Sequence, residues 1–528
     1  MTPPFSRTLP ALLDEQALRS GENVAVISEG ISTTYADLAH RAGQLASGLR
    51  ARGVKRGDRV GLLASNRTQW LEIFFGALAT GAVLVPISTW STQAELEFIL
   101  ADSGVTTLFS VASVGKEDFV TSLAALRPRL PRLQTLVMIA DAAPGWLDYA
   151  ALFGEAPLNL PPGEGPSATD DALILYTSGS TSKPKAVQLA HFGIIENGFN
   201  IGERQGLTAD DRVFASVPLF WAFGSANALP ATFTHGATLV LQDRFEPGAA
   251  LSLIEAHRCT AIYTLPGMTS ALIGHADFSS TRTESLRTGL TIGNPQDVIN
   301  AATVLGATQM CNVYGSSETY GNCCVTPSDW PLERRSTCQG PPLPGVRIRL
   351  IGAETGKPVG PGEAGLIEVS GYLMRGYGGQ SAVHNAQVFT EDGWYRTGDI
   401  GTLTAEGDIS FLGRNSEMIK RAGINVSPAE VEDVLMQHAS VAEAAVVGTP
   451  DRARDEAIIA FVVPVAGAAP STEELMAHCR SIASSYKLPD RIEFRESLPA
   501  TATGKLLRQS LKAEAAELHG EKAISYGA

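Results

Sequence analysis

The chain has 528 residues, of which 44% are hydrophobic and 18% charged, so its composition is that of an ordinary globular protein while its length is too great for one hydrophobic core. The formal net charge of −14 argues against a nucleic-acid-binding protein and against a membrane-surface protein that relies on a basic patch. An anionic substrate must therefore be bound by local lysines and arginines.

The N-terminal residues MTPPFSRTLPALLDEQ lack the apolar core of a signal peptide, which favours a cytoplasmic protein. The longest apolar stretch, residues 73–87, contains Gly81 and ends near Pro86. It is too short to span a membrane and predicts a buried helix, a glycine stop and a buried strand. The six cysteines lack the spacing of zinc ligands, so we expect free thiols that mostly fill the core.

Short β-rich runs alternate with helical patterns through about residue 410, which predicts an α/β fold with largely parallel sheets. The runs are GDRVGLLAS (57–65), AVLVPIS (82–88), TTLFSV (106–111), ALILYT (172–177), GATLVLQ (236–242), TAIYTLP (260–266) and QMCNVYG (309–315). Residues 156–168, rich in alanine, proline and glycine, are predicted to be a connector. No internal repeat interrupts this order.

From about residue 340 the pattern changes to strands separated by glycine and proline turns, namely VRIRLIG (346–352), GLIEVSG (365–371) and DISFLG (408–413). These runs predict a β-rich subdomain at the end of a large N-terminal domain, residues 1–412. GPGEAG (360–365) fits a dinucleotide-binding fingerprint formally, but a strand-like run follows it instead of a helix. We therefore interpret it as a turn.

The last part of the chain, residues 413–528, has the pattern of a small α+β domain. SPAE (427–430) and STEE (471–474) are capping boxes that predict a helix after each, and proline occupies the first helical position of the former. Strands are predicted over VAEAAVVG (441–448), AIIAFVVPV (457–465) and RIEFRE (491–496).

Residues 176–185, YTSGSTSKPK, follow a predicted buried strand with five hydroxyl side chains after the tyrosine and two lysines. Hydroxyls, exposed backbone N–H groups and ammonium charge together suit a polyphosphate. The spacing is not that of a Walker loop, because the position five after Gly179 is Pro184. Lys183 is predicted to be a solvated loop charge.

This loop and five further segments together resemble the adenylate-forming superfamily, in its acyl-CoA synthetase branch. The other segments, in the family's order and at its usual separations, are TIGNPQ (291–296), NVYGSSE (312–318), YRTGDIG (395–401), GRNSEMIKRAGINVSPAEVE (413–432) and PATATGKLLR (499–508). Members activate a carboxylate with ATP and Mg²⁺ as an acyl-adenylate and pass the acyl group to a nucleophile such as coenzyme A. Taken alone, each segment would read as an ordinary turn or surface charge; their collinearity makes the resemblance strong.

The resemblance implies a role for each matching residue. It assigns catalysis to Ser317, Glu318 and Lys505, and metal binding to Glu318 and Thr177. Nucleotide binding falls to Thr177, Ser178, Gly179, Ser180, Thr181, Lys185, Gly293, Asn294, Pro295, Asn312, Tyr314, Gly315, Ser316, Asp399 and Arg414. The acyl pocket is expected to include Phe220, Trp221, Phe223, Tyr263 and Tyr320, the acceptor side Lys420 and Gly423, and the hinge between the domains Ser416.

Three positions depart from the family pattern. Ser182 replaces a common glycine, Trp221 replaces a histidine near the reacting carboxylate, and Ser416 stands where aspartate or lysine is usual. The aromatic residues favour an aromatic, alicyclic or medium-chain acid over a long chain. Three functions stay open: a ligase that uses coenzyme A, an adenylating enzyme with another acceptor or co-substrate (carrier-protein pantetheine, an amine or an oxyanion such as nitrite), and a non-catalytic adenylate-binding protein. The partners expected are a small acid, with neither nucleic acid nor a membrane span, and a homodimer is left open.

Overall fold

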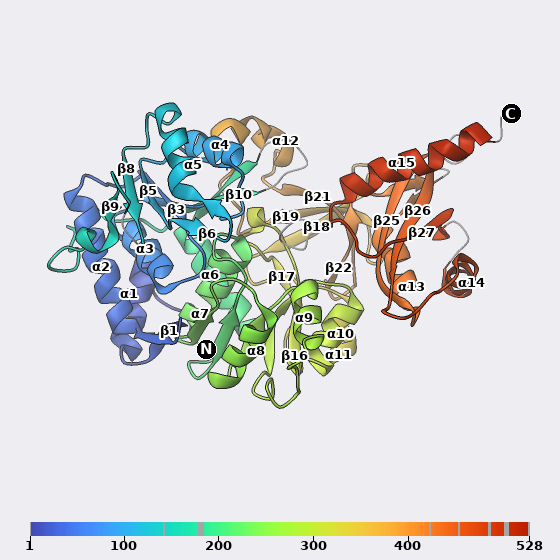
Figure 1. The fold of residues 1–528 in the computed structure, drawn as a ribbon, viewed down its shortest axis with the longest axis horizontal. Helices are drawn as coiled ribbons and strands as arrows, with labels where there is room; N and C mark the ends of the chain where they lie inside the picture. Colours follow the sequence, from blue (N-terminus) through green and yellow to red (C-terminus); the bar gives the residue numbers. More distant parts are fainter. Residues whose placement is uncertain are drawn as a thin grey trace. The chain divides into compact units, whose positions relative to one another are not determined.

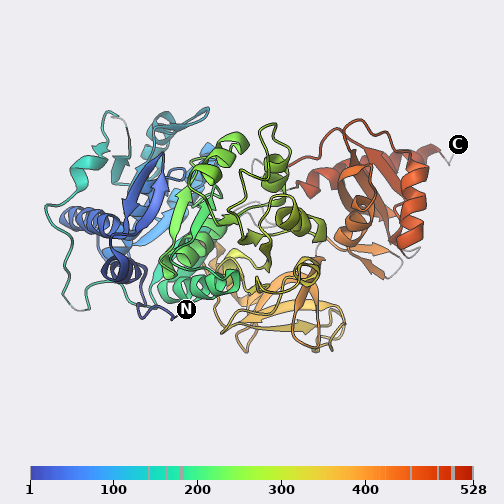
Figure 2. The same ribbon diagram turned by 90° about the horizontal axis from the view of Figure 1, so that it is seen from below.

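The computed structural model describes residues 2–140, 143–161, 163–177, 184–415, 417–421, 424–451, 455–483, 487–500 and 506–525. The chain divides into two compact units (Figures 1 and 2). The first comprises Met1–Ile348, Val369–Tyr395 and Glu406–Ile409, and the second comprises Arg349–Glu368, Arg396–Ala405 and Ser410–Ala528. The expected domain boundary between residues 412 and 413 stays a prediction.

One eight-stranded sheet of the first unit has the order β17-β16-β15-β14-β12-β13-β1-β2. Neighbours from β16 to β1 are parallel, and β2 and β17 join the two edges antiparallel. The strands are β1 (Val24–Ser28), β2 (Ile31–Thr34), β12 (Arg212–Ala215), β13 (Thr238–Leu241), β14 (Ala261–Tyr263), β15 (Thr288–Thr291), β16 (Gln309–Tyr314) and β17 (Cys324–Val325).

The second eight-stranded sheet has the order β20-β11-β10-β4-β3-β5-β8-β9. Neighbours from β10 to β9 are parallel, whereas β11 runs antiparallel to both β10 and β20. The strands are β3 (Arg59–Leu63), β4 (Val83–Pro86), β5 (Thr107–Ser110), β8 (Thr135–Met138), β9 (Leu147–Asp148), β10 (Asp171–Thr177), β11 (Lys185–Ala190) and β20 (Tyr377–Gly378). A separate hairpin pairs β6 (Ser113–Val114) with β7 (Glu117–Asp118). All seven predicted strand runs, and the largely parallel sheets, are therefore confirmed.

Helices α3 (Thr68–Ala79) and α6 (His191–Gln205) each contact strands of both sheets, so they lie between them. All residues of α3 from Trp70 to Leu78 are buried, as expected for a helix that is apolar on every side. The predicted glycine stop follows at Gly81, which has a φ of +81° before β4 begins.

The remaining helices of this unit are α1 (Leu9–Ser20), α2 (Tyr35–Ala51), α4 (Gln93–Ser103), α5 (Phe119–Leu126), α7 (Leu229–Thr234), α8 (Pro247–Ala256), α9 (Pro266–Ile273), α10 (Pro295–Thr303), α11 (Leu332–Thr337) and α12 (Asn385–Val388). A π-helix, η3 (Phe223–Ala228), precedes α7. The six cysteines of the chain are free and buried, as predicted.

The second unit holds most of a four-stranded sheet with the order β18-β19-β21-β22. Its strands are β18 (Arg347–Ile351), β19 (Gly365–Ser370), β21 (Tyr395–Leu403) and β22 (Ile409–Arg414). The prediction of a β-rich subdomain is confirmed, and the sequence GPGEAG forms a turn that leads directly into β19.

The same unit contains a five-stranded sheet with helices around it, drawn orange to red in Figures 1 and 2. Its elements are β23 (Ile419–Arg421), β24 (Ile424–Val426), β25 (Val441–Asp451), β26 (Asp455–Pro464), β27 (Arg491–Phe494), α13 (Pro428–Met436), α14 (Thr472–Ile482) and α15 (Arg508–Ser525). Ser427 and Ser471 are the N-caps of α13 and α14, as the capping boxes predict. Leu435 and Leu475 of these helices pack with Val446 and Ile458 of the sheet. Within the described part of the chain, no helix is long and apolar enough to cross a membrane.

Candidate active site

Several predicted site residues of the first unit lie at the carboxyl ends of strands in both sheets. Thr177 ends β10, Tyr314 ends β16, and Gly293 follows β15 by two residues. Loops at the carboxyl ends of parallel strands are the usual ligand-binding positions of open α/β sheets. Long-range topology therefore gathers segments that are separated by more than a hundred residues in the sequence.

The predicted phosphate loop connects two antiparallel strands. Thr177 at the end of β10 is paired with Lys185 at the start of β11, so these two residues form the base of the loop. Ser178, Gly179, Ser180 and Thr181, and with them Ser182 and Lys183, lie outside the described residues. The Nζ atom of Lys185 lies 5.2 Å from the ring centroid of Tyr377.

The segment from Tyr314 to Glu318 forms a tight turn into a short 3₁₀ helix, η4 (Ser317–Thr319). Gly315 is needed at the turn, because a Cβ atom there would lie 2.5 Å from the carbonyl oxygen of Gly321. Ser316 is the N-cap of η4, and its backbone N–H donates to Oγ1 of Thr319 at 3.0 Å. The turn therefore connects Tyr314, at the end of β16, with Ser317 and Glu318 at the start of η4.

Tyr320 ends this turn in the left-handed region, with a φ of +58°. Its carbonyl oxygen accepts hydrogen bonds from the amides of Asn197 at 3.1 Å and Asn227 at 2.8 Å, and its hydroxyl accepts the N–H of Ala190 at 3.1 Å. A non-glycine residue in this region is uncommon and is held there by its surroundings. The backbone after Glu318 is thus fixed by two side-chain amides.

Asn312, on β16, is fully buried, and its amide nitrogen donates to the carbonyl oxygen of Cys338 at 3.1 Å. Its Oδ1 atom accepts the N–H of Val313 at 3.0 Å. These contacts fix the strand that ends in Tyr314. The nucleotide-binding role assigned to Asn312 stays a prediction.

Gly293, Asn294 and Pro295 lead into α10. Asn294 is its N-cap, and the side chains of Asn294 and Asp297 exchange reciprocal hydrogen bonds with each other's backbone N–H at 3.0 Å. Burial raises the pKa of Asp297 to about 6, although the hydrogen bond from Asn294 opposes the shift. A half-buried carboxyl group therefore lies beside the predicted adenine-binding residues.

The predicted acyl-pocket residues fall into two groups. Phe220 and Trp221 contact Trp90, with ring centroids 5.2 Å apart in both pairs and the rings nearly perpendicular. Phe223 contacts the ring of Tyr263 at 5.2 Å, and Tyr263 and Tyr320 are buried with hydrogen-bonded hydroxyl groups. The first group is the more open one, because Trp221 is half-buried and Trp90 is 39% exposed.

Asn66 holds the segment that carries Phe220 and Trp221. Its amide nitrogen donates to the carbonyl oxygen of Val217 at 3.0 Å, and its Oδ1 atom accepts the N–H of Leu219 at 2.8 Å. Both contacts are buried. They fix the backbone just before the two aromatic side chains.

Two residues that contact the predicted site residues have no signal of their own in the sequence. Trp90, which follows β4 of one sheet, contacts Phe220 and Trp221, which follow β12 of the other sheet. Tyr377 lies on β20, and its hydroxyl donates to Oε1 of Glu318 at 2.7 Å. A lone tryptophan and a lone tyrosine in turn-rich segments give no pattern that would reveal these contacts.

In the second unit, Nε of Arg414 on β22 lies 2.9 Å from Oδ1 of Asp399 on β21. The two predicted ribose contacts are therefore neighbours. Lys420, on β23, is exposed, and its backbone N–H donates to Oε2 of Glu456 at 2.6 Å. Ser416, Gly423 and Lys505 lie outside the described residues.

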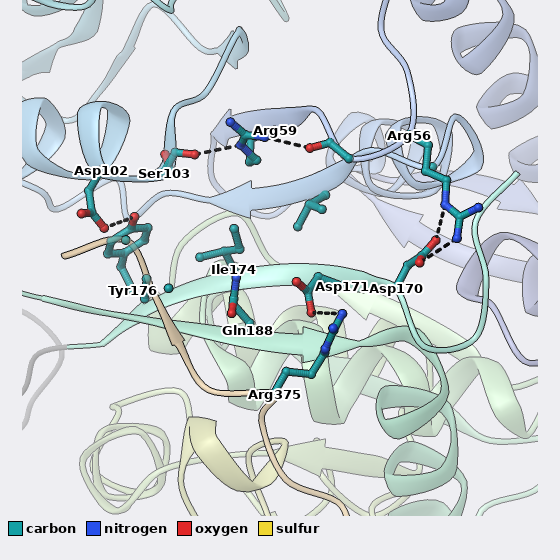
Figure 3. Close-up of a pocket in the computed structure, with 16 residues that line it drawn as sticks. Arg56, Arg59, Asp102, Ser103, Asp170, Asp171, Ile174, Tyr176, Gln188 and Arg375 are labelled. Atoms are coloured by element: carbon teal, nitrogen blue, oxygen red, sulfur yellow. Dashed lines mark hydrogen bonds and ion pairs between the residues drawn. The ribbon is translucent and has the colours of Figure 1, made fainter. Parts of the chain in front are cut away.

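A cavity of about 400 Å³ opens elsewhere on the first unit (Figure 3). Two pairs of its charged groups form ion pairs: Arg56 binds Asp170 through two contacts of 2.7 and 2.8 Å, and Arg375 lies 3.5 Å from Asp171. Arg59 donates to the carbonyl oxygens of Ser103 and Gly57, and Asp102 accepts the hydroxyl of Tyr176. Although burial opposes the shift, hydrogen bonds from Arg56 and Ser167 lower the pKa of Asp170 to about 2. None of the predicted site residues lines this cavity.

The comparisons with known proteins agree with this arrangement. Residues 13–378 match the AMP-binding enzyme family, and residues 430–505 match the AMP-binding enzyme C-terminal domain. The chain is 35% identical to a feruloyl-CoA synthase of Amycolatopsis sp over 94% of its own length and 97% of the relative's. It is 30% identical to the mitochondrial medium-chain acyl-CoA ligase ACSF2 of Mus musculus, over 96% of the chain and 87% of the relative.

Among solved structures, the anthranilate CoA ligase AuaEII in complex with anthranoyl-AMP is similar, with a TM-score of 0.87 and 28% identity over 98% of this chain and 99% of that one. The similarity to all three proteins extends over nearly the whole chain. The chain therefore belongs to the AMP-binding enzyme family, as an adenylate-forming enzyme of the acyl-CoA synthetase type.

Proposed function

We propose that the protein joins an aromatic, alicyclic or medium-chain carboxylic acid to coenzyme A. The observation that carries the choice of acid is the cluster of Trp90, Phe220 and Trp221 beside the carboxyl ends of β4 and β12. The rings of Trp90 and Trp221 are partly open, and that of Phe220 is buried in the cluster. Such a surface suits an aromatic ring or a short apolar chain. The names of the feruloyl, anthranilate and medium-chain relatives support the same range of acids.

The reaction has two steps. In the first, a carboxylate oxygen attacks the α-phosphorus of ATP, the bond to the β-phosphate oxygen breaks and pyrophosphate leaves. In the second, the thiol sulfur of coenzyme A attacks the carbonyl carbon of the adenylate, AMP leaves and the thiol proton is lost. Because negative charge develops on phosphate oxygens in the first step, preorganised donors and cations there contribute most to the rate.

The residues of the phosphate loop are proposed to supply those donors, with Lys185 at its base and Lys505 added from the C-terminal part of the chain. Tyr314 would stack on adenine, with Gly293 to Pro295 on its other side, and Ser317 would contact the α-phosphate. Asp399 and Arg414 would bind the ribose. We propose that the C-terminal domain turns about Ser416 between the two steps, because the steps need different groups at one phosphate.

The side chains of Glu318 and Thr177 would hold Mg²⁺, which neutralises phosphate charge when it is bound. Both offer hard oxygen ligands, and Mg²⁺ commonly uses one or two carboxylates together with substrate phosphates and water. The carboxylate of Glu318 is already oriented by the hydroxyl of Tyr377, so its position fits this role. The use of ATP and coenzyme A supports the expectation of a cytoplasmic protein.

The test is a pyrophosphate-release assay over a panel of acids, each measured with and without coenzyme A. We expect aromatic or medium-chain acids to give the fastest release and to form a thioester and AMP only when coenzyme A is present. Adenylate formation followed by transfer only to an amine or to carrier-protein pantetheine would overturn the choice of acceptor. Absence of acid-dependent pyrophosphate release with every acid would favour a non-catalytic adenylate-binding protein.

A further inference from the structure

Tyr377 lies between two residues of the proposed ATP site that are far apart in the sequence. Its hydroxyl donates a buried hydrogen bond of 2.7 Å to Oε1 of Glu318. The Nζ atom of Lys185 lies over the ring of Tyr377, 5.2 Å from the ring centroid, which is the distance of a cation–π contact. One side chain thus contacts both the carboxylate proposed for the metal and the lysine at the base of the phosphate loop.

Packing and hydrogen bonds hold Tyr377 in this position. Val187 on β11 pairs with Tyr377 on β20, and the tyrosine is only 3% exposed. The side chain of Asn385 binds its backbone twice, by accepting the Tyr377 N–H at 2.8 Å and donating to the Tyr377 carbonyl oxygen at 3.0 Å. The hydroxyl is therefore presented from a rigid strand.

Glu318 is held by the same segment at two points. Besides the bond from Tyr377, its carbonyl oxygen accepts the backbone N–H of Met374 at 2.7 Å. Within the described part of the chain, Tyr377 is the one residue whose side chain donates to the carboxylate of Glu318. One oxygen of that carboxylate is engaged by the tyrosine, and the orientation of the other is set by the same contact.

We propose that Tyr377 is a positioning residue that orients Glu318 toward a divalent cation and aligns Lys185 with the triphosphate, so that ATP and the cation bind together. The inference rests on the proposed roles of Glu318 and Lys185. Hydrogen bonds that orient a metal-ligating carboxylate change metal affinity or activity by about 10- to 100-fold when they are removed. The ring of Tyr377 adds attraction for the Lys185 ammonium without competing for its hydrogen-bond donors.

The variant Tyr377→Phe removes the hydroxyl and keeps the ring. The matched control is Tyr35→Phe, because Tyr35 is also buried and its hydroxyl donates to the carbonyl oxygen of Ala237 at 2.6 Å, in a region without proposed site residues. ATP binding is measured calorimetrically over a range of Mg²⁺ concentrations, and binding of Mn²⁺ in the presence of ATP is measured by electron paramagnetic resonance. Neither measurement depends on turnover.

We expect Tyr377→Phe to raise the cation concentration needed for half-maximal ATP binding by about 10- to 100-fold. The Tyr35→Phe protein should match the wild type. If Tyr377→Phe and Tyr35→Phe need the same cation concentration for half-maximal ATP binding, the inference is wrong. Should Tyr377→Phe fail to fold, Asn385→Ala keeps the tyrosine and loosens its backbone, and it should raise the requirement in the same direction.

The variant Glu318→Gln separates this inference from the proposed function. If Glu318→Gln raises the cation requirement and Tyr377→Phe does not, only the role of Tyr377 is wrong. If neither variant changes it, the assignment of Glu318 to the metal is wrong as well, and the inference fails with it.

Discussion

The carboxylate of Asp399 lies 2.9 Å from Nε of Arg414, across two neighbouring strands of the second unit. Asp399 is 4% exposed, while the side chain of Arg414 is 51% exposed. A buried carboxylate that already faces a cation is oriented before any ribose arrives. This pair therefore gives the first test of the proposed nucleotide contacts.

Asp399→Asn should weaken ATP binding by about 10- to 100-fold, because hydrogen bonds to a charged acceptor contribute more than neutral ones. The loss should be smaller for 2′,3′-dideoxy-ATP, which lacks the ribose hydroxyls. Dissociation constants for both nucleotides check this. Asp408→Asn is the control, because Asp408 is also 4% exposed and pairs with Arg334 at 2.6 Å. Equal losses for the two nucleotides would contradict the ribose role.

Trp221→Ala should shift acid preference toward bulkier acids, because the large side chain contacts Trp90 and Phe220 at the proposed acyl site. We expect the ratio of kcat/KM between bulky and small acids to rise by roughly tenfold or more. The KM for ATP should change little. Trp330→Ala, which removes a half-buried tryptophan that stacks on Arg334, is the matched control. An unchanged acid profile in a folded Trp221→Ala protein would make Trp221 a structural residue.

Lys505→Ala should separate the two steps of the reaction. The ammonium group is proposed to contact the carboxylate and the α-phosphate only while the adenylate forms. Loss of one such group costs on the order of 10² to 10³ in rate, and the loss should fall on acid-dependent ATP–pyrophosphate exchange. Thioester formation from a chemically made acyl-adenylate and coenzyme A should continue near the wild-type rate.

Lys512→Ala, which removes a lysine from α15, is the control for this experiment. Normal pyrophosphate exchange by Lys505→Ala would show that Lys505 is a surface lysine. Equal loss of both steps would contradict its proposed departure before thiol transfer.

Asp297→Asn should stabilise the protein at neutral pH. The pKa of Asp297 is raised to about 6 in the folded protein from 3.8, so the folded state binds more protons than the unfolded state between these values. Stability from this group is complete below about pH 4, falls as the pH rises toward 6, and stays lost above it. Asparagine retains an oxygen that can accept the N–H of Asn294 and does not ionise.

The unfolding temperatures of Asp297→Asn and wild-type protein should thus diverge between pH 4 and pH 6 and keep a constant difference, on the order of a few °C, up to pH 8. Asp210→Asn, which changes an exposed aspartate, is the control. A difference that is the same at pH 4 and pH 8 would show that Asp297 does not titrate in this range.

Local patterns in the sequence predicted most of the secondary structure, because each signal acts over a few residues. The capping serines 427 and 471, the glycine stop at Gly81 and the apolar strand runs all depend on nearest neighbours. The six family segments predicted the family for a different reason, since their order along the chain is itself information. These predictions needed no knowledge of which strands pair.

The features that could not be predicted all depend on contacts between segments that are far apart in the sequence. The contact between Tyr377 and Glu318 exists because β20 joins the edge of a sheet through β11, and these strands are far apart in the sequence. Trp90 meets Trp221 because the ends of β4 and β12, in different sheets, lie close together. The left-handed conformation of Tyr320 depends on amides from Asn197 and Asn227, and no local rule places a tyrosine there.

The π-helix Phe223–Ala228 begins two residues after Trp221. The number of residues in this segment therefore affects the orientation of Trp221. A π-helical turn holds one residue more than the α-helical turn that it replaces. Deletion of one residue would allow the segment to form a regular α-helix. Because one residue corresponds to about 100° of rotation around an α-helix axis, the side chains before the deletion would rotate by that angle. Trp221 would then face another direction while α7 keeps its place. On the proposed role of Trp221 in the acyl pocket, insertions and deletions in this segment, more than substitutions, are therefore a short evolutionary route to a different range of acids.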